Sequence, residues 1–255
     1  MSAKFMQDTH HSLRLLSLRF PSIPLYPRHI PLFRGGVMEN AGADNDLFHN
    51  HAPGGANLHR PALIQYRVAR DRACLWGMGG GALALERWWL SAPDVLQFGG
   101  RSYPLHAAEV RRENAALRMT EAGQWKYYRL HDYLALNAEN YRRWLDNPRL
   151  GFRAELLENT LTAHLLGFCQ AAGWRLPERL EVQLVDIHKR AKTRYHGVEL
   201  MAFEASYRCN LVLPGGIALG KAVSHGFGQQ WPLPRFEETH AEPLRRETAP
   251  LETAI

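Results

Sequence analysis

The sequence predicts an α+β protein made of two similar units, and three observations support this. Its 255 residues fit one large domain or two of ordinary size. Hydrophobic residues make up 45% of the chain and charged residues 22%, a composition that can bury a core. Runs with the period-two alternation of strands are interleaved with segments of helical periodicity. In the first half their order is β-α-β-β-α-β, which is that of a ferredoxin-like fold.

Six segments define the first unit. Strands are expected where apolar side chains alternate or form short runs, and helices where they recur every three to four residues. The first helix contains a proline and is expected to end at two glycines. The strands are predicted at 13–20, 61–69, 73–78 and 103–118, and the helices at 28–38 and about 81–97.

The second unit is less regular. Asn137 is the predicted N-cap of a short helix, and Gly173 ends a longer amphipathic one. The extended segments are predicted at 125–130, 180–187, 200–213 and 229–233, and the helices at 137–145 and 152–172.

We therefore predict two tandem ferredoxin-like (RRM-like) domains, the second with a C-terminal glycine-rich loop. The N-terminal domain is expected at residues 1–122 and the C-terminal domain at 123–235. Residues 236–255 are rich in Glu, Thr, Ala and Pro, and we predict that they form a disordered tail.

Several classes of protein are disfavoured by what the sequence lacks. No apolar run approaches the ~20 residues of a membrane-spanning helix, and the N-terminus lacks the apolar stretch of a signal peptide. The three cysteines, Cys74, Cys169 and Cys209, are isolated, which argues against a disulfide framework and a Cys-x-x-Cys zinc site. A cytoplasmic protein without a membrane partner is expected.

The basic residues are clustered in a chain whose formal net charge is +6. Residues 11–38 and 47–70 contain arginines and histidines but no acid. A third cluster, called the basic run below, consists of Lys189, Arg190, Lys192 and Arg194. Such clusters are typical of a surface that binds phosphate groups, and the alternative is an ordinary solvated surface.

The most distinctive motif is PGGIALGKAVSHGFGQQW at 214–231, called the glycine-rich segment below. Its glycines let the backbone approach an anion closely, and Lys221 and His225 add donors. Gly215 to Lys221 also matches the start of a nucleotide-binding P-loop. However, Ala222 stands where that motif needs a Ser or Thr to bind magnesium, which argues against an NTPase. A glycine-rich turn without a ligand is the alternative.

A second motif, LFHNHAPGGANLHRPALIQYR at 47–67, places His49, His51 and His59 around a Pro-Gly-Gly turn. Histidine exchanges protons near neutral pH, as general acid/base cleavage of RNA requires. One alternative is a set of surface histidines without a role. The other is a metal site, which would need a third or fourth ligand at suitable spacing.

These motifs resemble those of the CRISPR-associated endoribonucleases that cut precursor CRISPR RNA within each repeat. GIALGKAVSHGFG is similar to the signature loop of that family, and here too it follows an alternating strand that ends in NLVLP. FRG (33–35), LFHNH (47–51), PALIQYR (61–67) and the helix LLENTLTAHLLGF resemble one branch of the family. The similarity extends over about residues 12–233, in the same order.

The resemblance implies cleavage of RNA without a metal ion or another cofactor. In that chemistry the ribose 2′-hydroxyl attacks the adjacent phosphate, giving a 2′,3′-cyclic phosphate and a 5′-hydroxyl. His49 and His51 would be the acid and the base, and Lys221 or Arg34 would stabilise the charge. The chain departs from many relatives at His225, where they carry Arg, and some members rely on arginines instead of histidines.

The implied ligand is CRISPR repeat RNA, expected as a stem-loop. The residues expected to contact it are Tyr66, Arg67, Lys189, Arg190, Lys192, Arg194, Gly220, Lys221, His225, Gly226 and Gly228. The expected product is mature crRNA, and the protein is expected to stay bound to it in an effector complex with other CRISPR subunits. The alternatives are a catalytically inactive crRNA-binding subunit of such a complex and a metal-dependent nuclease.

Overall fold

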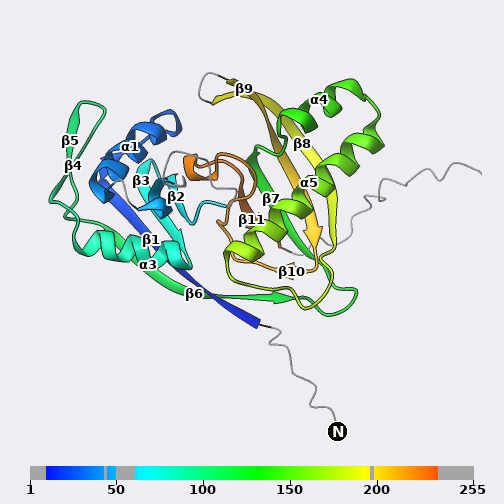
Figure 1. The fold of residues 1–255 in the computed structure, drawn as a ribbon, viewed down its shortest axis with the longest axis horizontal. Coiled ribbons are helices and arrows are strands. Elements are labelled where there is room, and N and C mark those ends of the chain that lie inside the picture. The colour runs from blue at the N-terminus through cyan, green and yellow to red at the C-terminus, as the bar shows by residue number, and fades with distance from the viewer. Residues whose placement is uncertain (1–9, 43–44, 50–60, 196–197, 235–255) are drawn as a thin grey trace, which may run out of the picture.

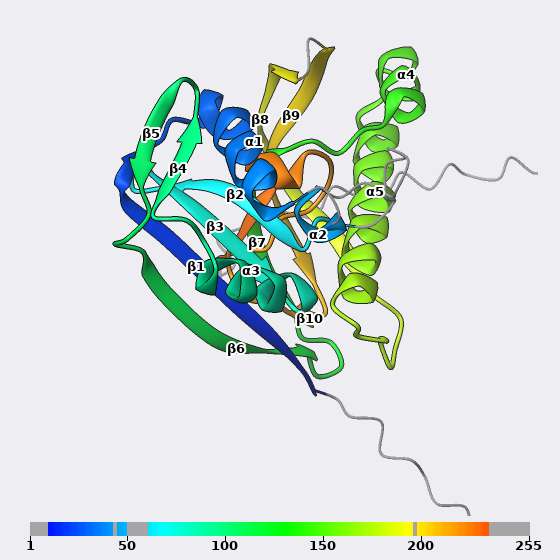
Figure 2. The same cartoon turned by 60° about the vertical axis from the view of Figure 1, so that its left-hand side comes forward.

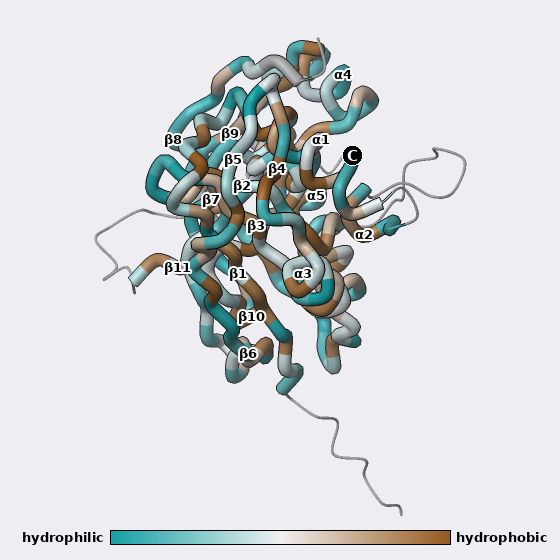
Figure 3. The backbone as a smooth tube through the Cα atoms, turned by 90° about the vertical axis from the view of Figure 1, so that its left-hand side faces the viewer, coloured by the Kyte–Doolittle hydropathy of each residue, from teal (hydrophilic) through white to brown (hydrophobic). Residues whose placement is uncertain are grey.

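The computed structural model describes residues 10–42, 45–49, 61–195 and 198–234. These residues form two main antiparallel sheets, each covered by helices on one face, and a separate two-stranded hairpin (Figure 1). The predicted α+β class is therefore confirmed. Apolar and polar residues are interleaved along most of the chain (Figure 3), and no helix in the described ranges is long and apolar enough to cross a membrane.

The first unit has the predicted β-α-β-β-α-β order, with additional elements. Its main strands and helices are β1 (His10–Pro24), α1 (Ile30–Ala41), β2 (Ile64–Ala69), β3 (Arg72–Met78), α3 (Gly80–Leu90) and β6 (Glu109–Met119). The additional ones are a 3-10 turn, η1 (Pro27–His29), the short α2 (Asp46–His49), and a hairpin of β4 (Val95–Phe98) and β5 (Arg101–Pro104). The helix predicted to reach residue 97 ends at Leu90, because Pro93 restricts the residue before it and cannot donate a helical hydrogen bond.

The second unit contains the predicted helices, but the strand predicted at 180–187 is longer and the one predicted at 200–213 divides into two strands at Asn210. Its elements are β7 (Lys126–Tyr133), α4 (Ala138–Asp146), α5 (Leu150–Ala171), β8 (Val182–Tyr195), β9 (Val198–Cys209), β10 (Leu211–Val212), η2 (Val223–His225) and β11 (Gln229–Pro232). Asn137 caps α4 as predicted, because its side chain accepts a 2.7 Å hydrogen bond from the Asn140 amide. The basic run belongs to β8, which extends well beyond the predicted residue 187.

The second unit departs from the ferredoxin-like order at one point. A complete β-α-β-β-α-β unit has a helix between its third and fourth strands. Between β9 and β11 this chain has instead β10, turns and the three-residue η2. The glycine-rich segment thus occupies the place of that helix.

The two sheets share one strand order. The first is β10-β6-β1-β3-β2 and the second is β11-β7-β9-β8, so apart from β10 each runs fourth, first, third, second along its own unit. The exception connects the units: Leu211 of β10 pairs with Met119 of β6, so the chain leaves the second sheet and joins the first immediately before the glycine-rich segment.

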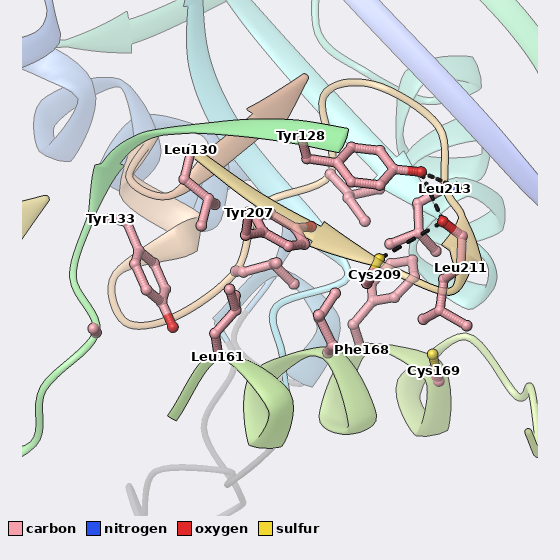
Figure 4. Close-up of a cluster of buried hydrophobic side chains, with 14 of the residues drawn as sticks. Tyr128, Leu130, Tyr133, Leu161, Phe168, Cys169, Tyr207, Cys209, Leu211 and Leu213 are labelled. Atoms are coloured by element: carbon pink, nitrogen blue, oxygen red, sulfur yellow. Dashed lines mark hydrogen bonds between the residues drawn. The ribbon is translucent and has the colours of Figure 1, made fainter. Parts of the chain in front are cut away.

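The first sheet has buried residues on both faces. One face packs with α1 and α3 in a core that includes Phe20, Phe33 and Tyr66. Leu15 and Trp76 on the other face join a core that is shared with the second unit. In that shared core, the Tyr128 side chain of β7 points towards Leu213 and Leu211 (Figure 4), and its hydroxyl donates to the Leu211 carbonyl at 3.0 Å.

The glycine-rich segment lies at the junction of the units. Two views place it (orange) between α1 and β2 of the first unit and β7 and α5 of the second (Figures 1 and 2). The chain therefore brings residues from both halves to one place, and most of the residues predicted to act on RNA lie near it.

Candidate functional site

Arg34 and His49 lie together on the N-terminal side of this junction. Arg34 is in α1 and His49 is the last residue of α2. The Arg34 Nη2 donates to the His49 carbonyl oxygen at 2.9 Å, and its guanidinium carbon lies 5.9 Å from the centre of the Tyr66 ring. The structure therefore brings together one predicted charge stabiliser and one predicted acid/base residue.

A backbone carbonyl orients the imidazole of His49. The Nε2 atom lies 3.1 Å from the Gly42 carbonyl oxygen. Because a carbonyl oxygen can only accept a hydrogen bond, Nε2 carries the proton and Nδ1 is the basic atom of the neutral ring. This geometry suits removal of a proton from a hydroxyl group by His49.

His51 and His59, the other two histidines of the 47–67 motif, lie outside the described residues. The described chain stops at His49 and resumes at Pro61. The pairing of His49 with a second histidine therefore stays a prediction.

The conformation of the glycine-rich segment explains several of its glycines. Gly220 and Gly228 have φ values of 91° and 71°. Residues with a side chain are strained at such positive φ values, whereas glycine is not. A Cβ on Gly226 would lie 2.9 Å from the Ile30 Cδ1 in the first turn of α1, one turn before Arg34. These glycines are thus required for folding and packing, and their contact with RNA stays a prediction.

Tyr66 and Arg67 are both buried by the folded chain. Tyr66 is fully inaccessible in the first core, where burial raises the pKa of its hydroxyl. Arg67 is 6% exposed, and its Nη2 donates to the Gly216 carbonyl and to Gln65. Its guanidinium carbon is 4.2 Å from the Trp76 ring centre, and burial lowers its pKa to about 10, which leaves it charged at neutral pH.

The burial of these two residues places them behind the solvent-accessible surface. Arg67 connects β2 to the glycine-rich segment, and Tyr66 packs beneath Arg34. Their position supports a role in holding other groups in place. A strand with alternating residues normally exposes one of each pair, and nothing in β2 itself signals that both are covered.

Of the two side chains that the glycine-rich segment was expected to offer, one is exposed. Lys221 is exposed, and its backbone N–H donates to the Leu134 carbonyl at 3.0 Å. His225 is buried, with 8% of its surface exposed, and its Nδ1 lies 3.1 Å from the Ser224 hydroxyl. The Lys221 side chain is therefore accessible, whereas His225 supports the turn.

Beside Lys221 is a pair of residues that no sequence motif predicted. The Tyr133 hydroxyl lies 2.7 Å from Nδ1 of His164, which is in the middle of α5. Burial, together with a smaller effect of the positive charge of Lys221, lowers the pKa of His164 to about 4. The available signal was a single histidine within the apolar pattern of the helix, LTAHLLGF, which local sequence does not distinguish from a core position.

The basic run lies on β8, the edge strand of the second sheet, and β9 and β7 separate β8 from β11. Lys189 pairs in register with Glu204, and Glu204 accepts a hydrogen bond from the Asp132 amide, whose own carbonyl accepts from Gly228. Further along, Lys192 forms a 2.7 Å ion pair with Glu199. Lys189, Arg190 and Lys192 are exposed, and Arg194 is in the strand opposite Glu199.

Comparison with known proteins identifies the family. The model of the Cas6b N-terminal domain matches residues 11–116, and that of the Cas6b C-terminal domain matches residues 120–230. The chain belongs to the Cas6b family. This confirms the resemblance to CRISPR RNA processing endoribonucleases that the motifs indicated.

Solved structures of Cas6b proteins have the same fold. A crystal structure of Cas6b superposes with a TM-score of 0.76 at 22% identity, covering 88% of this chain and 100% of the other. A crystal structure of a CRISPR RNA processing endoribonuclease Cas6b gives 0.67 at 19% identity, with 88% and 100% covered. An uncharacterized protein of Methanocaldococcus jannaschii is 27% identical over 103 residues, which are 40% of this chain and 69% of that protein.

Proposed function

We propose that this Cas6b-family protein is a metal-independent endoribonuclease that cuts CRISPR repeat RNA into mature crRNA. The observation that carries the proposal is the Arg34–His49 contact beside the glycine-rich segment, in a chain whose two halves both match Cas6b models. One of the similar structures is described as a CRISPR RNA processing endoribonuclease.

The proposed reaction uses groups from both units. His49 Nδ1 takes the proton of the ribose 2′-hydroxyl, and the 2′-oxygen attacks the adjacent phosphorus. The bond from phosphorus to the 5′-oxygen breaks, and His51 gives that oxygen its proton. Arg34 and Lys221 stabilise the extra negative charge of the phosphorane. The products are a 2′,3′-cyclic phosphate and a 5′-hydroxyl.

RNA binding is proposed to follow the positive charge. The exposed residues of the basic run and Lys221 would contact phosphates of a stem-loop, because phosphate contacts supply most of the affinity for such RNA. We also propose that the protein keeps the product bound and joins other effector subunits through this complex.

Cleavage of a repeat RNA under single-turnover conditions tests the proposal. Equal rates with and without EDTA are expected, together with products that carry a cyclic phosphate. A substrate with deoxyribose at the cleaved position should bind with unchanged affinity and remain intact. Loss of activity in EDTA would indicate a metal-dependent nuclease, and binding without any cutting of the all-ribose RNA would indicate an inactive crRNA-binding subunit.

A further inference from the structure

The Tyr133–His164 pair has a defined proton arrangement. Tyr133 is 2% exposed, and burial raises the pKa of its hydroxyl far above the ordinary value, so the hydroxyl keeps its proton. It therefore donates to His164 Nδ1, at 2.7 Å, with the two rings edge to face. Since Nδ1 of the neutral ring is the acceptor, Nε2 carries the proton.

The geometry of the pair directs this N–H away from the core. Tyr133 and Leu161 belong to the buried cluster between β7 and α5, and Figure 4 shows the Tyr133 hydroxyl pointing towards the helix. His164 is only partly buried, and its Nδ1 edge faces that cluster. Nε2 is on the other side of the ring, so its N–H points away from the Tyr133 hydroxyl.

The surroundings of His164 are those of the proposed site. The glycine-rich segment crosses the Tyr133 ring at Gly220, where a Cβ would be only 2.8 Å from a ring carbon. Lys221 follows at once and is exposed. On α5, Gly167 is on the same face as His164, and a Cβ there would lie 3.9 Å from Pro61, where the described chain resumes after the histidine motif.

A neutral donor is suited to this position. A second cation next to Lys221 would be repelled by it, and burial further disfavours charging the imidazole, which lowers its pKa to about 4. The ring therefore keeps the same proton arrangement from mildly acidic to basic pH. A hydrogen bond from a neutral donor to an anionic phosphate is still stronger than one between two neutral groups.

We propose that His164 binds the RNA backbone beside the cleaved phosphodiester, donating its Nε2–H to a non-bridging phosphate oxygen, and that Tyr133 is the positioning residue that fixes this tautomer. The inference rests on the proposed function, since it assigns one more contact to the same RNA site. At this contact Lys221 attracts the phosphate by its charge, and the hydrogen bond from His164 orients the phosphate.

Two substitutions separate this role from a structural one. In His164→Asn the amide oxygen can replace Nδ1 as acceptor for Tyr133, but no donor reaches the position of Nε2. In His164→Gln the amide nitrogen can replace the Nε2 donor, and the contact with Tyr133 is lost. The unfolding midpoint of each variant is measured first, as a control for folding.

The expected result is that Asn is the harmful change. Single-turnover cleavage and RNA affinity should fall about 10- to 100-fold in His164→Asn, and both should stay within about threefold of wild type in His164→Gln. The slope of log affinity against log salt should not change in His164→Asn, whereas Lys221→Ala should reduce it by about 0.7. Wild-type affinity and cleavage in His164→Asn would overturn the inference.

The assay also separates this inference from the proposed function. If wild-type protein cuts the repeat RNA and His164→Asn cuts it equally fast with equal affinity, only the inference fails. If wild-type protein binds the RNA without cutting it, the proposed function fails, and the affinities of the two variants still decide the role of His164.

Discussion

Gly228 offers a quantitative test of how closely the glycine-rich segment is packed. Its φ is 71°, and a Cβ there would overlap the carbonyl oxygen of Leu219. Gly228 also takes part in two hydrogen bonds: Leu219 N–H donates to its carbonyl at 2.9 Å, and its N–H donates to the Asp132 carbonyl at 3.2 Å. Gly100, in the turn between β4 and β5, has φ of 72° with nothing within 4 Å of its Cβ position. It is therefore a matched control for backbone strain alone.

The difference between Gly228→Ala and Gly100→Ala isolates the cost of the overlap. Left-handed φ should cost about 1–2 kcal/mol of unfolding free energy in both variants. In Gly228→Ala the backbone must also move away from Leu219, weakening two hydrogen bonds worth about 1 kcal/mol each. We therefore expect a loss of about 3–4 kcal/mol for Gly228→Ala and about 1–2 kcal/mol for Gly100→Ala.

Urea unfolding at equilibrium measures both values, with the m-value checked for two-state behaviour. The two variants should also differ in RNA cleavage, since only Gly228→Ala displaces the segment that carries Lys221. Equal losses of stability in the two variants would refute the packing of Gly228 against Leu219.

Three further predictions concern binding, catalysis and pH. Changing all four residues of the basic run to Ala should weaken RNA binding and reduce the slope of log affinity against log salt by up to about 3. Glu199→Gln, which frees Lys192 from its ion pair, should strengthen binding. An unchanged slope in the fourfold variant would mark the run as a solvated surface. At least one of His49→Ala and His51→Ala should slow single-turnover cleavage by about 10²–10⁴-fold while RNA affinity is retained. If both variants cut at the wild-type rate, the assignment to histidines is wrong, and Arg34 and Lys221 are the next residues to test. The pKa of His164 is lower in the folded protein than in the unfolded chain, where it is about 6.5, so the unfolded chain binds the extra proton first. The free energy of unfolding should therefore fall by up to about 3 kcal/mol as pH drops from about 6.5 to about 4. Urea titrations of wild type and His164→Gln across that range check this, and the part of the pH dependence that comes from His164 should vanish in the variant.

The elements of this protein could be predicted from its sequence because their signals are local. Alternation of apolar residues indicated the strands, and periodicity indicated α5. The cap at Asn137 depends on residues only three positions apart, so it too could be predicted. The family resemblance came from ordered short motifs, and the matches to both Cas6b domains confirm it.

The limits of elements were less predictable where neighbours decide them. β8 continues through the basic run because it pairs with β9 as far as Tyr195 and Val198. Four basic residues within six positions indicated that this segment is exposed to solvent. The pattern did not distinguish an exposed loop from an exposed strand of a long hairpin. The composition of the glycine-rich segment indicated a loop. It did not indicate that this loop takes the place of the second helix of the ferredoxin-like unit.

Tertiary structure alone decided which side chains of the site are accessible. In β2 the usual rule is that every second side chain faces solvent, and it would expose Arg67 opposite Tyr66. Here α1 and α3 cover one face of the sheet, while the glycine-rich segment, 149 positions further along, covers Arg67 through its Gly216 carbonyl. The contact between Tyr133 and His164 likewise joins a strand and a helix 31 positions apart. A local pattern shows only how apolar and polar residues recur along one segment. Whether both faces of a sheet are buried depends on segments that are distant in the sequence, so the pattern cannot predict it.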